Sequence, residues 1–263
     1  MQHHQACQRL CDATFARPVW LCLLRRSATT QPRPFLLEKP LPLYTDRDLE
    51  RLVLKWQSSR AICTQVQPKE RASPVLVPTD VHLVEGGRWL LFGMCDGSVR
   101  YHDLNETSEP VTLVPTVFGK EAHATTLLSV DMDQDAPFMS FNLGIMSSAS
   151  TRDDNLSTPL RARCIEVHRV MPYWDDNGQV RGLQAERLTC FPEENVYDCD
   201  LFTLHGNNVA YSLDSSKPPI NVTGRLITIV DWTVADTTSF VYPRKIIFRR
   251  YAQVSCLVLF LLN

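Results

Sequence analysis

The segment that most constrains the fold is residues 86–104, which read GGRWLLFGMCDGSVRYHDL. Two short apolar runs in it, Arg88–Phe92 and Val99–Leu104, have the composition of β-strands. Between them lies Cys95–Ser98, whose central Asp-Gly pair is the strongest short signal of a hairpin turn. The segment therefore predicts an antiparallel pair of strands that ends in Asp103, where the chain leaves the sheet.

Short runs of the same kind continue along the chain after about residue 74, and no segment after residue 60 carries the apolar stripe of a helix. The further strands that we predict are Val75–Val77, Val81–Val84, Thr126–Met132, Phe138–Ile145, Arg163–Val170, Gln184–Cys190, Asp198–Leu204, Asn208–Leu213 and Arg225–Trp232. Asp176–Gly178 marks another turn. Short strands without intervening helices predict an antiparallel, all-β architecture rather than parallel βαβ units.

The chain before these strands is helical in pattern. A helix over about residues 5–15 is predicted by an apolar stripe at helical spacing, made of Cys7, Leu10, Cys11 and Thr14. Pro18 suits the first turn of a second helix, over about 18–26. Prolines concentrate in residues 32–42 and predict an extended linker. A third helix, over about 46–58, follows a capping pair of Thr45 and Asp48.

Two of the predicted strands end alike, since VRYHDL and LITIVDWT each place an aspartate where the chain leaves the sheet. This rhythm is typical of propeller blades. We count about three such units, over residues 75–113, 125–171 and 183–242. A closed propeller needs roughly four to eight blades. The expected fold is therefore mainly β with short N-terminal helices, in an incomplete β-propeller-like array of antiparallel blades.

Taken in order, five pieces of the chain resemble one known family: RLCDATFARPVWLCLL, the proline-rich linker, DLERLVLKWQSS, GGRWLLFGMCDGSVRYHDL and GRLITIVDWT. They are similar to the F-box protein family of mushroom-forming (basidiomycete) fungi, in which a degenerate WD-repeat-like propeller follows the F-box. The resemblance implies the C-terminal half of an F-box over residues 1–30, a proline-rich linker and helix over 31–62, and a partial propeller over 75–263. The leucine-proline helix that opens an F-box does not precede these pieces, so we expect an N-terminally truncated F-box.

The function that this resemblance implies is that of a non-catalytic substrate receptor in an SCF-type cullin-RING ubiquitin ligase. In that family the F-box docks on a Skp-type linker protein, which joins it to the cullin, and the propeller presents a protein substrate. The residues expected to bind the linker are Leu10, Trp20, Leu23 and Leu24. A plain core role for Trp20 stays open. The alternative is a propeller-type interaction module, or an inactive family fragment, with no ligase role.

Composition excludes several other classes of function. The net charge is −2 and basic residues do not cluster, so nucleic acid is not an expected partner. Because no phosphate loop, dinucleotide fingerprint or nucleophile elbow occurs, we expect neither an enzyme nor a cofactor. The nine cysteines lack regular spacing and no signal peptide is visible, which predicts a cytoplasmic or nuclear protein. The arginine-rich start leaves mitochondrial import as an alternative. The apolar tail Val254–Leu262 is too short to span a membrane.

Three residue sets have the composition of a metal site, and for each we favour a structural explanation. Asp131, Asp133 and Asp135 alternate as in a calcium loop but lack its glycine and terminal glutamate. His3, His4, Cys7 and Cys11 lack a second ligand pair at zinc-finger spacing. Cys190 and Cys199 flank an acidic loop that we expect to connect two blades. No metal is therefore expected.

Overall fold

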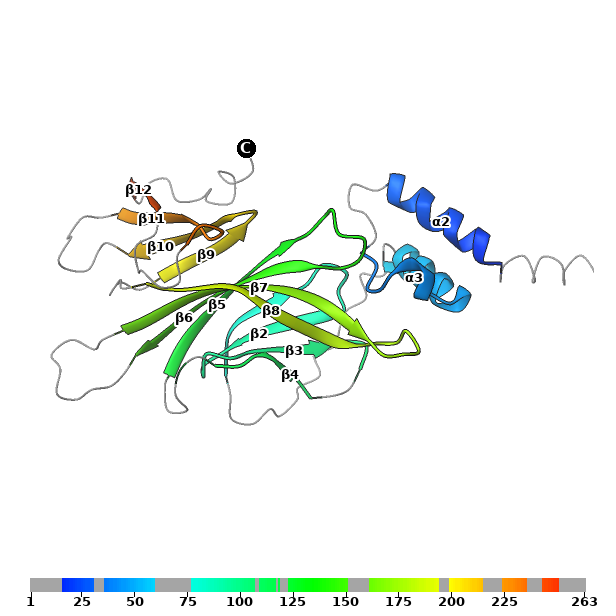
Figure 1. Cartoon of the computed structure of the whole chain (residues 1–263), viewed down its shortest axis with the longest axis horizontal. Helices are drawn as coiled ribbons and strands as arrows, with labels where there is room; N and C mark the ends of the chain where they lie inside the picture. Colours follow the sequence, from blue (N-terminus) through cyan, green and yellow to red (C-terminus); the bar gives the residue numbers. More distant parts are fainter. Residues whose placement is uncertain are drawn as a thin grey trace, which may run out of the picture. The chain divides into compact units, whose positions relative to one another are not determined.

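The computed structural model describes ten stretches of the chain (Figure 1): residues 16–30, 36–59, 77–106, 109–116, 118, 123–150, 161–193, 199–214, 224–235 and 243–250. These stretches fall into two compact units. The helical unit comprises the residues up to 73 together with residues 137–139 and 172–181. The sheet unit comprises residues 74–136, 140–171 and 182–263.

Two of the three predicted helices lie in the helical unit, and both are confirmed. Helix α2 spans Arg17–Thr30 and helix α3 spans Asp46–Ser59, with a short 3-10 helix, η1 (Leu41–Leu43), between them. The helix expected over residues 5–15 lies outside the described residues. At the start of α3, the Asp48 backbone N–H donates to Thr45 Oγ1 and the Thr45 N–H donates to Asp48 Oδ2, both at 3.2 Å. The predicted capping pair therefore forms.

The helical unit has its own apolar core, in which α2 packs against α3. Its buried members are Trp20, Leu24, Tyr44, Leu49 and Val53. Lys39 is buried beside them: its Nζ donates to Asp48 Oδ2 at 3.2 Å and to the carbonyl oxygen of Gly178 at 2.8 Å. The segment 172–181 is thus bonded to the helices of its own unit.

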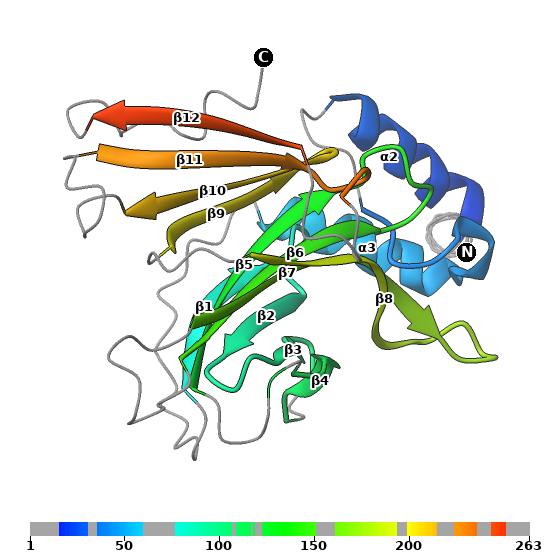
Figure 2. The same ribbon diagram turned by 60° about the vertical axis from the view of Figure 1, so that its left-hand side comes forward.

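Three four-stranded sheets carry the rest of the described chain, and each runs in sequence order with antiparallel neighbours (Figures 1 and 2). The first sheet contains β1 (Pro78–Leu83), β2 (Trp89–Met94), β3 (Val99–Asp103) and β4 (Val111–Val114). The second contains β5 (His123–Met132), β6 (Phe141–Ser150), β7 (Arg161–Trp174) and β8 (Val180–Glu193). The third contains β9 (Cys199–His205), β10 (Asn208–Asp214), β11 (Gly224–Asp231) and β12 (Arg244–Arg250). Among the described residues no helix follows α3, so the predicted mainly β fold is confirmed.

The predicted hairpin turn between β2 and β3 is also confirmed. Gly97 has φ of +84°, a left-handed conformation that favours glycine. Asp96 completes the turn by accepting the Ser98 backbone N–H at 2.8 Å. The loop itself comprises Cys95–Gly97, since the Gly97 N–H donates to the Met94 carbonyl oxygen at 3.0 Å, so the Asp-Gly pair ends a three-residue loop instead of lying at the centre of the turn.

Four details of the strand prediction are wrong or incomplete. Strands β4 and β12 were not predicted. Gln184–Cys190 belongs to β8, the last strand of the second sheet, so a third blade does not begin at residue 183. Of the expected strand Val75–Val77, Val77 lies before β1 and the other two residues are outside the described part. The predicted boundary between the second and third blades is wrong because the turn at Asp176–Gly178 folds β8 back beside β7, in the same sheet.

The sheets meet at their first strands, where β5 lies beside both β1 and β9. The Thr126 backbone N–H donates to Thr79 Oγ1 at 3.0 Å, and the Leu128 N–H donates to Asp80 Oδ2 at 2.7 Å. Between β5 and β9, the Leu204 N–H donates to Ser129 Oγ at 2.8 Å. Side chains of one sheet thus accept hydrogen bonds from backbone N–H groups at the edge of the next sheet. Without them these edge N–H groups would be unpaired.

An aspartate lies at the end of the third strand of each sheet, or directly after it, and its side chain stabilises the turn that follows. The carboxylates of Asp103, Asp175 and Asp231 accept the backbone N–H two residues further on, at 2.9, 3.0 and 3.0 Å respectively. Such Asx-turns stabilise the change of direction as the chain leaves a strand. The sequence pattern identified Asp103 and Asp231; Asp175 is the third member of the series, which supports a propeller-like repeat.

Candidate functional site

The residues expected to bind a linker protein lie mostly inside the helical unit. Trp20 and Leu24 are buried, at 8% and 7% exposure, in the core between α2 and α3. Leu23 is half-buried and packs against the same core. Leu10 lies outside the described residues. These side chains hold the helix pair together, and other residues form the surface of α2.

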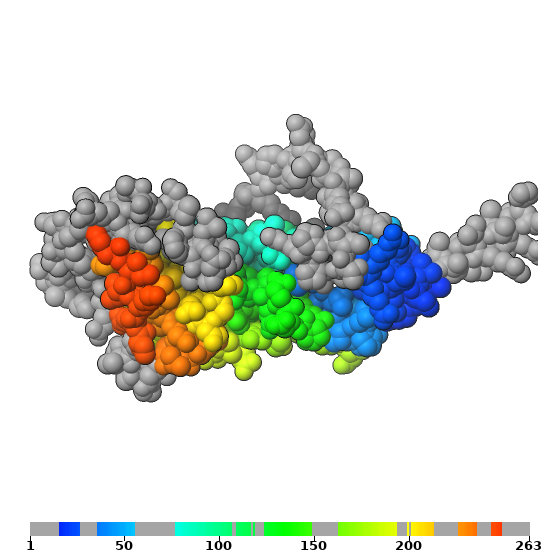
Figure 3. All heavy atoms as spheres, turned by 90° about the horizontal axis from the view of Figure 1, so that it is seen from above, coloured from blue at the N-terminus to red at the C-terminus, as the bar shows by residue number. Residues whose placement is uncertain are grey.

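The exposed surface of α2 (dark blue in Figure 3) combines apolar and basic side chains. A shallow depression on it is lined by Arg17, Pro18, Leu21, Cys22, Arg25 and Arg26. Val19 is 41% exposed on the same helix. Arg17 is fixed in place, since its guanidinium donates to the carbonyl oxygens of Leu41 and Tyr44. This surface has the mixture of groups that protein interfaces use.

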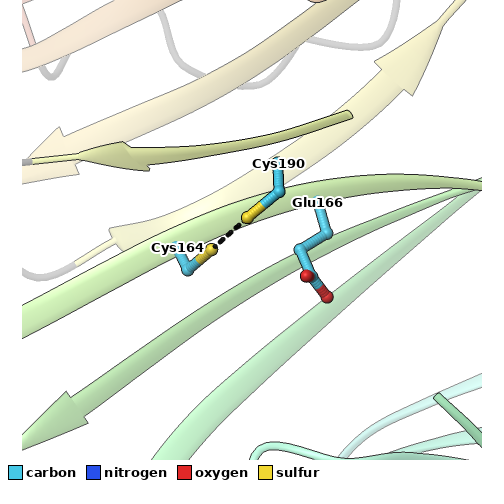
Figure 4. A group of neighbouring side chains, drawn as sticks. All are labelled: Cys164, Glu166 and Cys190. Atoms are coloured by element: carbon cyan, nitrogen blue, oxygen red, sulfur yellow. Dashed lines mark hydrogen bonds between the residues drawn. The ribbon is translucent and has the colours of Figure 1, made fainter. Parts of the chain in front are cut away.

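A second candidate site lies in the sheet unit, where β7 and β8 bring together Cys164, Glu166 and Cys190 (Figure 4). One ligand atom of each residue lies within 4.8 Å of the others, and the two Sγ atoms are 3.1 Å apart. Ile165 and Val167 pack into the apolar core of the unit. Because side chains alternate along a strand, Cys164 and Glu166 share the opposite face of β7.

Glu166 is the buried carboxylate of this cluster, at 5% exposure. Its Oε2 lies 3.2 Å from His168 Nε2, and its Oε1 lies 3.7 Å from Nη1 of the exposed Arg187. Burial alone would raise the pKa of Glu166, but the hydrogen bond with His168 and the charges of His168 and Arg187 outweigh it and lower this pKa. Glu166 is therefore a carboxylate at neutral pH.

The two thiols share a hydrogen bond and do not titrate alike. The hydrogen bond between the Cys164 and Cys190 thiols lowers the pKa of Cys190. The same hydrogen bond, with burial, raises the pKa of Cys164. The pair consequently loses its first proton more easily than an isolated thiol and its second less easily.

Of the other predicted residue sets, the two that lie in the described part of the chain do not converge on a shared ligand position. Asp131 accepts the Gly206 N–H at 2.7 Å, while Asp133 pairs with Arg169 at 3.3 Å. The Cys199 thiol donates to the carbonyl oxygen of Leu201 rather than approaching Cys190. The set His3, His4, Cys7 and Cys11 lies outside the described residues.

The cluster around Glu166 was missed at the level of sequence, although part of its signal is visible there. Cys164, Glu166 and His168 alternate along a predicted strand and so had to share one face. Cys190 is 26 residues from Cys164 in sequence, and only the pairing of β7 with β8 brings it to that face.

Comparison of the chain with family models, curated proteins and solved structures finds no match. Of the helices that the structure describes, none is both long and apolar enough to cross a membrane.

Proposed function

We propose that this chain is a non-catalytic protein-binding adaptor, the substrate receptor of an SCF-type cullin-RING ubiquitin ligase. Its helical unit binds a Skp-type linker, and its sheet unit binds a protein substrate. The observation that carries the proposal is the order of the two units: a helix pair with its own core precedes three blade-like sheets. This is the order in which the N-terminal sequence resembles an F-box and the later sequence resembles a degenerate propeller.

The surface that we propose for the linker is the exposed side of α2, which includes Val19 and Cys22. An aliphatic side chain that is 41% exposed, as in Val19, is available to fill a pocket on a partner. Arg25 and Arg26 are exposed on the same helix and favour a partner with acidic groups at the rim of the contact.

The surface that we propose for the substrate is the outer face of the first sheet. Val81 and Leu83 on β1 are 51% and 53% exposed, and they pair with the half-buried Phe92 and Leu90 on β2. Trp89 and Leu91 point to the opposite, buried face. An apolar sheet face with exposed aliphatic side chains marks a protein-binding surface more often than scattered single residues do.

The test is calorimetric titration of the full chain with a purified Skp-type linker bound to the N-terminal region of a cullin. We expect binding in the micromolar range, because a docking surface depends on a few anchors and the exposed side of α2 offers Val19 and the partly exposed Leu21 as apolar anchors. Val19→Asp on α2 should weaken the binding at least about tenfold, since it places a charge at a central apolar contact.

The matched control is Leu54→Asp on α3, where the leucine is 49% exposed and should leave the affinity unchanged. Val81→Lys with Leu83→Lys should also leave it unchanged, because these residues lie in the sheet unit. If no binding is detected at about 100 µM, well above the micromolar Kd that we expect, the ligase role fails. The chain would then be an interaction module without that role.

A further inference from the structure

Cys164 and Glu166 on β7 and Cys190 on β8 form a possible metal-ligand set that has no role in the proposed adaptor function. Two sulfur atoms and a buried carboxylate lie within 4.8 Å of one another, in the part of the chain that the structure describes. Figure 4 shows the two sulfur atoms pointing toward each other, with the Glu166 carboxylate beside them. Soft thiolate ligands with one carboxylate suit a thiophilic divalent cation.

We propose that Cys164, Cys190 and Glu166 bind a single divalent cation of the zinc class. Zinc is held by cysteine sulfur at about 2.3 Å and by carboxylate oxygen at about 2.0–2.2 Å, in tetrahedral geometry. Both cysteines are half-buried, and a water would supply the fourth ligand, as in zinc sites with three protein ligands. His168 is a positioning residue that holds the carboxylate through its hydrogen bond at 3.2 Å.

The geometry requires only a small adjustment to accept the ion. Two thiolates on a tetrahedral zinc lie about 3.8 Å apart, so the Sγ atoms must separate somewhat from their present 3.1 Å. The backbone that carries Cys164 is well supported, since β7 pairs with β6 without a register break from Phe141 opposite Val170 to Ser150 opposite Arg161, and β8, which carries Cys190, is bonded to β7. Rotation of the two cysteine side chains is therefore sufficient.

The charges of the cluster also favour a cation. The Glu166 carboxylate is buried, and a cysteine sulfur from each of the two strands lies beside it. Arg187 stands 3.7 Å from the carboxylate, but its side chain is 61% exposed and can turn to solvent when the ion binds. Binding displaces both thiol protons to solvent, so the affinity should fall as the pH decreases.

The test uses the full chain, reduced and freed of metal, titrated with Co²⁺ as a spectroscopic substitute for zinc. We expect one equivalent to bind, with a sulfur-to-cobalt charge-transfer band in the near ultraviolet and the intense visible bands of tetrahedral cobalt. Zinc should then displace the cobalt and abolish both signals. Cys164→Ser and Cys190→Ser should each weaken cobalt binding and reduce the charge-transfer intensity per bound cobalt to about half, because one thiolate remains.

Two further variants separate ligands from neighbours. Glu166→Gln and His168→Gln should each weaken cobalt binding about 10–100-fold while leaving the charge-transfer band in place at saturation. The matched control is Cys95→Ser, which removes a half-exposed thiol in the turn between β2 and β3. The Cys95→Ser substitution should change neither the stoichiometry nor the affinity of cobalt binding. Circular dichroism of every variant establishes whether it is folded.

Three results would overturn the proposal. The first is a spectrum without a charge-transfer band, and the second is equal loss of binding in the Cys95→Ser variant. The third is a Cys164–Cys190 disulfide, detected by peptide mass spectrometry, that forms in air even with zinc in excess. The pair would then be oxidised with loss of two electrons and two protons to dioxygen, and would not be a metal site. Because the cluster shares no residue with the proposed linker surface, any of these outcomes leaves the adaptor proposal to be judged by its own titration.

Discussion

Replacing Arg244 by alanine is expected to lower the free energy of unfolding of the sheet unit by about 3 kcal/mol, the low end of the cost of removing one partner of a buried ion pair, because the Arg244 side chain is 27% exposed while that of Glu193 is buried. The side chain of Glu193, at the end of β8, has no exposed surface. Its Oε1 accepts a hydrogen bond from Arg244 Nη1 on β12 at 2.8 Å, and its Oε2 accepts one from the Tyr211 hydroxyl on β10. The network therefore joins the second and third sheets, and Arg244→Ala removes this cation from a buried carboxylate.

The measurement is urea unfolding followed by tryptophan fluorescence, with a surface ion pair as the control. Arg181 pairs with Asp175 at 2.7 Å, but its side chain is 59% exposed. Arg181→Ala should therefore cost no more than about 1 kcal/mol. The double variant Arg244→Met with Glu193→Gln should recover part of the loss, because no buried charge remains. Equal effects of Arg244→Ala and Arg181→Ala would show that Glu193 is not buried as described.

Trp89→Ala should destabilise the first sheet to a similar degree, by about 3–5 kcal/mol, the range for truncating a buried tryptophan. Trp89 is 1% exposed and contacts the edge of the Tyr101 ring at a centroid distance of 5.6 Å. The Arg88 guanidinium lies over the Trp89 ring at 4.4 Å and is held there by Asp103, at 2.6 Å. The substitution removes the ring contacts with Tyr101 and Arg88 and leaves a cavity.

The control for this prediction is Trp232→Ala, which removes the same type of side chain from a less buried position. Trp232 is half-buried at the margin of the core between the second and third sheets, and its Nε1 donates to the Gly206 carbonyl oxygen at 2.9 Å. Its loss should lower the unfolding midpoint less than the loss of Trp89. A larger effect at Trp232 would contradict the placement of Trp89 in the core.

Local features of this fold could be predicted because the signals for them are local. Val99 and Tyr101 alternate with Arg100 and His102, and the structure buries the first pair while leaving the second pair half-exposed. The Thr45–Asp48 capping pair and the Asp-Gly turn depend on neighbours within three residues. Periodicity and turn chemistry were therefore sufficient for α2, α3 and most strands.

Features that depend on pairing between distant residues could not be predicted. β4 has only four residues and β12 has arginine or lysine at both ends, so neither shows a clear apolar pattern. The contact of Cys164 with Cys190 exists only because β8 returns beside β7. Trp20 illustrates the same limit, since its helical stripe predicts a buried face but not whether a helix or a partner covers it. In the structure, the core shared with α3 covers it.

The arrangement on which this account depends is the array of three sheets joined at their first strands. Hydrogen exchange of individual backbone amides, followed by NMR, tests it directly. The Leu128 N–H donates to Asp80 Oδ2 of the first sheet, and the Leu204 N–H donates to Ser129 Oγ of the second. Both amides should exchange slowly, because each is protected by a side chain of the preceding sheet.

The decisive comparison is the variant Asp80→Ala. It should speed exchange at Leu128 at least about tenfold, the consequence of losing a charge-assisted hydrogen bond, while exchange at Leu204 stays unchanged. Rapid exchange at Leu128 in the unaltered chain, or no change in its exchange rate in Asp80→Ala, would contradict the arrangement of the three sheets. The proposed substrate-binding role of the sheet unit depends on that arrangement.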